Sequence, residues 1–246
     1  MRRLRPAPSA AVDPAVRAAI LGSFRGSVPD DDLTLLEPRR RARFLREKRW
    51  IFGALSSAEL HVAFAVVDLG YIATAFAHAF ALRGEHLLAR GSFDAPPALG
   101  RVRRTEADGL RAAFHHPRAV FRIEQRGRIL RVDFALPGLT THAVVALDSG
   151  PPPLTAIAPL AGDGVTLTEK RALLPVEGSV QAAGQTYALR DAVAGLDYSH
   201  GLLPREVQWR WAFVQGLFDD GAPFALNLVD GFVGERENGL FHGGDV

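Results

Sequence analysis

The sequence predicts an all-β protein made of two consecutive antiparallel β-barrel or sandwich halves, with a short N-terminal helix before them. Short segments of alternating side-chain character, separated by Gly, Pro and Asp turn signals, recur along most of the chain. In the segment 71–82, small and larger side chains alternate from residue 72 onward, as a tapering barrel or two closely packed layers require. Three prolines at 151–153 cannot join a sheet, and the β pattern restarts after them.

Composition indicates an ordinary globular protein. The 246 residues are 48% hydrophobic and 23% charged. Cysteine is absent, which excludes disulfides, thiolate chemistry and cysteine metal sites. Nearly all basic residues are arginine, Lys48 and Lys170 being the exceptions, and a net charge of +2 is weak evidence for nucleic acid. No apolar run approaches the roughly 20 residues that span a bilayer, so a soluble cytoplasmic protein with no membrane span and no nucleic-acid partner is the default expectation.

Residues 1–47 are expected to hold the helix and a basic linker. Asp13-Pro14 followed by apolar residues and Gly22 predicts a short helix, with Asp as N-cap and Pro in the first turn. Residues 29–32 predict a turn. The arginine-rich run at 39–49 is either a solvated linker or helix face, or a patch for phosphates or an anionic surface. The former is favoured, because Phe44 is the one aromatic residue within the run.

Residues 48–149 are expected to form the first β half and residues 150–246 the second. Strands are predicted at 51–55, 58–67, 71–82, 86–93, 120–124, 129–136 and 141–147, with a short helix near 106–114. After the prolines, strands are predicted at 154–158, 165–173, 177–182, 185–189, 207–215 and 223–229. Since a barrel half needs further strands to cover its edge, either the chain lacks a segment at its C-terminal end or that edge is protected by other means.

The densest set of hydrogen-bonding side chains begins at Asp197. Residues 197–201 predict a turn-rich connection into the strand at 207–215, in which Trp209 and Trp211 share an apolar face. These residue types suit acid–base chemistry. They also suit an ordinary loop whose side chains form hydrogen bonds with its own backbone groups. The candidate catalytic residues are Asp197, His200 and Glu206. The candidate ligand-binding residues are Tyr71, Tyr198, Trp209, Trp211 and Asn227.

Several short motifs, in order, resemble the family called domain of unknown function 2804. They are Lys48-Arg49-Trp50, Asp68-Leu69-Gly70-Tyr71, Asp197-Tyr198 with Gly201, Trp209-Arg210-Trp211-Ala212, Asn227-Leu228 and Glu237-Asn238. The resemblance implies lipocalin-like halves with an apolar cavity, distantly similar to carotenoid hydratases and related proteins that act on terpenoid or polyketide substrates. It assigns no catalytic residue. We expect structural roles for Lys48, Arg49, Trp50, Asp68, Glu237 and Asn238, with Trp50 buried.

Two functions remain open at this point. The first is a non-redox enzyme that hydrates, isomerises or cyclises an apolar small molecule in a dry pocket. The second is a carrier that holds a lipid-like ligand without changing it. Glycine-rich nucleotide loops are absent and His115-His116 would point to opposite faces of a strand, so neither cofactor nor metal is predicted. The sequence does not indicate an oligomeric state.

Overall fold

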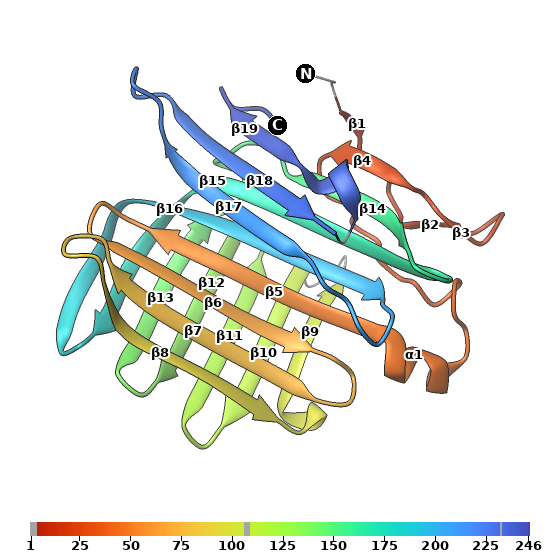
Figure 1. The fold of residues 1–246 in the computed structure, drawn as a ribbon, viewed down its shortest axis with the longest axis horizontal. Coiled ribbons are helices and arrows are strands. Elements are labelled where there is room, and N and C mark those ends of the chain that lie inside the picture. Colours follow the sequence, from red (N-terminus) through yellow and green to blue (C-terminus); the bar gives the residue numbers. More distant parts are fainter. Residues whose placement is uncertain (1–3, 106–108, 232) are drawn as a thin grey trace. The chain divides into compact units, whose positions relative to one another are not determined.

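The computed structural model describes residues 4–105, 109–231 and 233–246. The structure is 65% strand and 5% helix, which confirms the all-β prediction (Figure 1). It forms two compact units: unit 1 comprises Met1–Arg49, Pro151–Leu173 and Asp197–Val246, and unit 2 comprises Trp50–Gly150 and Leu174–Leu196. The division of the chain into residues 1–47, 48–149 and 150–246 stays a prediction.

Unit 2 is a nearly closed antiparallel barrel. Its strands are β5 (Glu47–Ser56), β6 (Leu60–Asp68), β7 (Ala73–Ala81), β8 (His86–Ala95), β9 (Gly100–Thr105), β10 (Gly109–His116), β11 (Ala119–Arg126), β12 (Ile129–Leu136) and β13 (Leu139–Ala146), with parts of β15 (Gly164–Ala182) and β16 (Gln185–Leu202). They lie in the order β8-β7-β6-β5-β16-β15-β13-β12-β11-β10-β9. The 3-10 turn η1 (Pro97–Leu99) joins β8 to β9, and β9 contacts β6 (Figure 1).

The alternation predicted for residues 71–82 is confirmed in β7. Its alanines from Ala73 to Ala81 are buried, and the larger residues between them are half-buried. The small face allows a close approach, because a Cβ at Gly100 of β9 would lie 2.3 Å from the Cβ of Ala73. The small side chains of β7 therefore let the two ends of the sheet meet.

Aromatic side chains fill the interior of unit 2. The rings of Phe121 and Phe134 stack with centroids 5.1 Å apart. The ring of Phe64 lies 5.4 Å from that of Phe134, and the ring of Phe114 lies 6.1 Å from that of Phe121. All four are buried. Such offset and edge-on pairs stabilise a core beyond the area that they bury.

Replacing Gly100 by alanine is expected to lower the free energy of unfolding by about 1–3 kcal/mol, since overpacking a filled core costs that much. Gly100 has an extended backbone with φ −144°, so the loss would come from the Cβ contact and not from backbone strain. The measurement is urea unfolding. Gly100→Ala combined with Ala73→Gly should recover most of the loss, and a double variant as unstable as the single one would contradict this account.

Unit 1 contains two sheets and short strands. Its elements are β1 (Arg5–Pro6), β2 (Val12–Asp13), β3 (Ala18–Ala19), β4 (Gly22–Arg25), α1 (Arg40–Arg46), β14 (Leu154–Leu160), β17 (Arg210–Leu217), β18 (Pro223–Asp230), η2 (Gly234–Glu237) and β19 (Gly239–His242), with the remaining parts of β15 and β16. Strand β14 pairs with β15 and β4, and β17, β18 and β19 form a separate sheet. Buried Leu154 and Ala158 of β14 pack in apolar clusters with Ala225 and Val229 of β18. The two sheets of unit 1 thus share an apolar core.

The helix predicted after Asp13 is wrong. Residues 12–13 and 18–19 pair as β2 and β3, with a turn between them. Oδ1 of Asp13 accepts a hydrogen bond from the backbone N–H of Ala15 at 2.9 Å, so the aspartate closes a turn instead of starting a helix. The short α-helix of the described residues is α1, which lies in the arginine-rich run.

Two further element predictions need correction. Residues 109–114 of the helix suggested near 106–114 belong to strand β10, and residues 106–108 lie outside the described part. The strand predicted from Val207 begins only at Arg210. Pro204 lacks the backbone N–H that a ladder needs and lies in an irregular connection that delays the strand.

Candidate functional site

Residues 197–201 form the last part of β16 and not the predicted loop. Successive side chains of a strand point to opposite faces, and this segment follows the rule. Asp197 and Ser199 contact one group of polar residues, while Tyr198 and His200 contact another. The candidates Asp197, Tyr198 and His200 are therefore divided between two buried networks, both within unit 1.

The first network is the Lys170 cluster, made of Lys170, Asp197 and Glu237. Nζ of Lys170 lies 2.5 Å from Oδ2 of Asp197 and 3.4 Å from Oε2 of Glu237. The three side chains are 5%, 10% and 3% exposed. Hydroxyls of Thr168 and Ser199 donate to Oδ1 of Asp197 at 3.1 and 3.2 Å. Two buried carboxyl groups thus share one ammonium group.

Burial and charge give the two carboxyl groups of this cluster different roles. Burial raises the pKa of Glu237 to about 7, with Asp197 adding to the rise and Lys170 opposing it. Burial also disfavours the charge of Lys170, but Asp197 and Glu237 outweigh it and raise the pKa of Lys170. Glu237 therefore binds a proton near neutral pH while Lys170 stays charged. Oε1 of Glu237 is buried and has no hydrogen-bond partner among the described residues.

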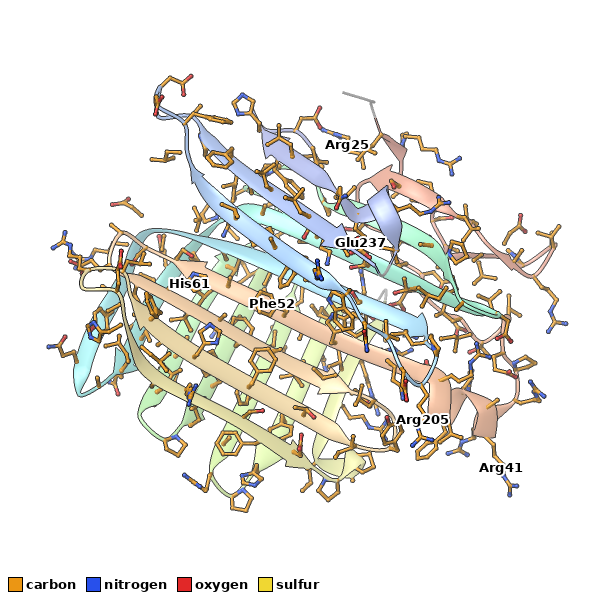
Figure 2. All side chains as sticks on the ribbon, viewed as in Figure 1. Arg25, Arg41, Phe52, His61, Arg205 and Glu237 are labelled. Atoms are coloured by element: carbon orange, nitrogen blue, oxygen red, sulfur yellow. The ribbon has the colours of Figure 1, made fainter. Side chains whose placement is uncertain are left out.

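Asn227 holds two parts of this site in place. Its side chain is buried in β18, where Oδ1 accepts a hydrogen bond from Nε1 of Trp211 at 2.7 Å and Nδ2 donates to the backbone oxygen of Glu237 at 2.7 Å. The ring of Trp211 lies 5.3 Å from Nζ of Lys170, a cation–π distance, and stacks with Phe213. Figure 2 shows Glu237 at η2, beside β18. The amide thus fixes both an aromatic wall and the backbone that carries the acid.

The second network is the His200 cluster, made of His200, Asp31, Glu47 and Tyr198. Nδ1 of His200 lies 3.4 Å from Oδ2 of Asp31, and Nε2 lies 3.0 Å from Oε1 of Glu47. The hydroxyl of Tyr198 donates to Oδ2 of Asp31 at 2.5 Å. Nδ1 of His200 is buried and makes no hydrogen bond with the described residues, so Asp31 lies beside it at ion-pair distance only. That Tyr198 touches a ligand and that His200 acts as an acid or base stay predictions.

Three other candidates lie outside both clusters. Glu206 is exposed in the irregular connection before β17. Trp209 is 47% exposed and precedes the strand, so it does not share a strand face with Trp211. Tyr71 belongs to unit 2 and is 45% exposed. Roles for these residues in catalysis or ligand binding stay predictions.

The motif residues at the start of β5 make local contacts. Nζ of Lys48 donates to the backbone oxygen of Leu45 at 2.9 Å, and Arg49 forms an ion pair with Glu47 at 2.9 Å. Trp50 is half-buried, not buried as expected.

The remaining motif residues also bond to nearby backbone. Oδ1 of Asp68 accepts from the backbone N–H of Gly70 at 3.0 Å, which closes the turn after β6. Oδ1 of Asn238 accepts from the backbone N–H of Val229 at 2.6 Å, which ties β18 to the segment after η2. Structural roles for both residues stay predictions.

Sequence reasoning missed Lys170 altogether, although one signal pointed to it. The chain has 29 basic residues, and only Lys48 and Lys170 are lysines. Both are buried, at 5% and 4% exposure. In a protein whose other cations are arginines, a lysine marks a place where a compact ammonium group fits and a planar guanidinium does not.

Some kinds of site are not seen in the described part of the chain. No three or more histidine, aspartate or glutamate side chains of residues 4–105, 109–231 and 233–246 are arranged to hold a metal ion. Over those same residues, no helix has the length and apolar character needed to cross a bilayer.

Comparison with solved structures shows similarity in fold at low sequence identity. Kievitone hydratase from Nectria haematococca is 12% identical with a TM-score of 0.50, over 81% of this chain and 60% of that chain. CghA, also solved with Sch210972, is 12% identical with a TM-score of 0.55, over 81% of this chain and 59% of that chain. This chain therefore spans about three-fifths of each.

Curated protein sequences give no match. The family model described as domain of unknown function (DUF2804), by contrast, matches residues 13–246, nearly the whole sequence. That match covers every residue of both buried networks. The chain therefore belongs to the DUF2804 family.

Proposed function

We propose that the Lys170 cluster is an acid–base site for non-redox chemistry, hydration or isomerisation, on an apolar small molecule. The observation that carries this proposal is the buried carboxyl group of Glu237, whose Oε1 has no partner among the described residues and whose pKa is raised to about 7. A general acid works best when its pKa lies near the working pH. The ring of Trp211, beside Lys170, supplies an aromatic wall that can stabilise positive charge on a substrate.

The chemistry uses the residues of the cluster and water. Protonated Glu237 gives its proton to one carbon of an alkene, and the electron pair of the double bond forms the new C–H bond. Water then adds to the electron-poor carbon and returns a proton to the carboxylate, which completes a hydration. Loss of a proton from a neighbouring carbon to the same carboxylate would instead complete an isomerisation. Lys170 and Asp197 keep the charge of the site balanced throughout.

The fold supports this class of reaction by analogy. Kievitone hydratase, as its name states, is a hydratase, and it shares the fold over 81% of this chain. Fold alone does not fix chemistry, so the proposal depends on Glu237. Asp197, which we predicted as catalytic, becomes the partner that holds Lys170 in this scheme, and His200 and Glu206 take no part in it.

The test begins with the ligand. Purified protein would be extracted with organic solvent and the extract analysed by mass spectrometry. Terpenoid and polyketide alkenes would then be incubated with the protein in water labelled with ¹⁸O or deuterium. Hydration adds labelled oxygen, and isomerisation incorporates deuterium. We expect turnover that falls as pH rises through about 7, because Glu237 then loses its proton.

Two variants separate the outcomes. Glu237→Gln keeps the shape of the side chain but has no acid proton. This variant should still bind the ligand, but its turnover should fall at least 100-fold, within the range that general acids contribute. Glu206→Gln, at an exposed carboxylate outside the cluster, is the matched control and should retain activity. A ligand that is retained without turnover by wild type and both variants would show a carrier instead of an enzyme.

A further inference from the structure

The His200 cluster has a geometry that depends on its protonation state. The imidazole is 0% exposed and has a carboxylate oxygen near each nitrogen, Asp31 at 3.4 Å and Glu47 at 3.0 Å. A neutral imidazole can donate from one nitrogen only, whereas an imidazolium donates from both. His200 can therefore satisfy both carboxylates only when it carries a positive charge.

Asp31 reaches His200 from an irregular segment before α1, residues 28–37. Its two neighbours cap turns: Oδ1 of Asp30 accepts from the backbone N–H of Asp32 at 3.0 Å, and Oδ1 of Asp32 accepts from that of Thr34 at 2.8 Å. Asp31 points the other way, into the protein, where Tyr198 also donates to it. One carboxylate therefore ties this segment to β16.

Other charges around the cluster make the two carboxylates unequal. Glu47 also lies 2.9 Å from Nη2 of Arg49 and 3.9 Å from Nε of Arg43. Arg49 attracts Asp31 as well, but less than His200 and Tyr198 do. If His200 lost its proton, Glu47 would keep two arginine partners, whereas Asp31 would keep mainly the neutral hydroxyl of Tyr198. Nε2 of His200 makes a hydrogen bond with Glu47, whereas Nδ1 makes none with the described residues. A neutral imidazole therefore keeps its one N–H on Nε2, and the loss falls on the Asp31 contact.

We propose that His200 is a pH-sensitive clasp: as an imidazolium it holds residues 28–37 against β16, and when it is deprotonated it releases them. Buried Val28 and Leu33 also anchor this segment, so release means local opening of the segment and not unfolding of the unit. The clasp does not depend on the chemistry proposed for the Lys170 cluster, because it uses the opposite face of β16.

The direction of the pH effect follows from the contacts. Burial and the charge of Arg49 lower the pKa of His200, but the carboxylates of Asp31 and Glu47 raise it more, so the pKa lies above the ordinary value. When the pKa of a histidine is higher in the folded state than in the unfolded chain, where it is about 6.5, its protonation stabilises the folded state. This stabilisation is fully present at pH values below the unfolded-state pKa. It is lost as the pH rises through the folded-state pKa. The segment should be held at neutral pH and released on the alkaline side.

The test combines two measurements on the full chain. Side-chain NMR between about pH 6 and pH 9 would follow the charge of His200, whose signals are identified by their loss in His200→Gln. Hydrogen exchange, corrected for the intrinsic effect of pH, would give the protection of residues 28–37. We expect that protection to fall at least ten-fold over the pH range in which His200 loses its proton. His200→Gln should show the lower protection at every pH.

Controls keep the result specific. The same experiment in a Glu237→Gln background removes the other buried group that titrates near neutral pH, and the fall in protection should persist. His86→Gln, at an exposed histidine of unit 2, should leave it unchanged. If His200→Gln does not fold, Asp31→Asn is the alternative, and its segment should lose protection without following the His200 titration. A neutral His200 at pH 7, or protection that does not change as His200 titrates, would overturn the proposal.

Discussion

The Lys170→Met protein is expected to lose about 3–5 kcal/mol of unfolding free energy at neutral pH, the usual cost of removing one partner of a buried ion pair. Methionine fills much of the space of the lysine but carries no charge. Asp197, 10% exposed, would then keep only the hydroxyls of Thr168 and Ser199 as neutral donors. The expected loss comes from leaving a carboxylate buried without a cation.

A double-mutant cycle would test this origin. Asp197→Asn in the Lys170→Met background removes the uncompensated charge, so the double variant should be more stable than Lys170→Met alone. Arg128→Met is the contrast, because its ion pair with Asp148 is 2.9 Å long but lies on the surface. Exposed pairs contribute only about 0–1 kcal/mol. Equal losses in Lys170→Met and Arg128→Met would show that burial is not the cause.

The stability difference between wild type and Glu237→Gln is expected to change by about 2–3 kcal/mol between about pH 5 and about pH 8. The pKa of Glu237 is raised from 4.5 to about 7, so the folded protein holds this proton more tightly than the unfolded chain does. The resulting stabilisation is fully present below about pH 4.5 and is lost as pH rises through about 7. Glutamine does not titrate, so the unfolding free energy of the variant should rise relative to that of wild type as the pH increases.

Urea unfolding of both proteins at several pH values would measure this change. Other groups also titrate in this range, and taking the difference between the two proteins removes them. Glu206→Gln is again the control, and its difference from wild type should stay within about 0.5 kcal/mol, as is usual for surface substitutions. A Glu237→Gln protein that tracks wild type at every pH would mean that Glu237 titrates as an ordinary surface carboxylate does.

The parts of the fold that the sequence predicted well have one small or apolar face. Strand β7 was predicted from its strict alternation, because its buried alanines and half-buried larger residues differ clearly in type. The end of β16 was predicted as a loop because both of its faces are buried and both carry polar groups. Aspartate, serine and glycine in succession are typical of turns, and only contacts distant in sequence make them a strand.

Catalytic and ligand-binding roles for the candidate residues stay predictions, but some of these residues lie close together. Asp197, Trp211 and Asn227 were identified from their residue types, and they do lie around one buried cluster. Lys170 was missed because it lies in the middle of a strand pattern with no other catalytic residue type at a recognisable spacing. Glu237 was assigned a structural role, since its burial depends on β18 and η2, which no local pattern reveals.

The alternation at the end of β16 also has a consequence for folding. Sliding this strand by one residue against β15 would exchange its two faces, because side chains alternate with a period of two. Lys170 would then face Tyr198 and His200, and Asp31 would face Asp197 and Ser199. Two buried cations would meet on one side and two buried anions on the other. The paired networks therefore penalise a misaligned strand more than apolar side chains alone would, and they favour a single alignment of β16 against β15.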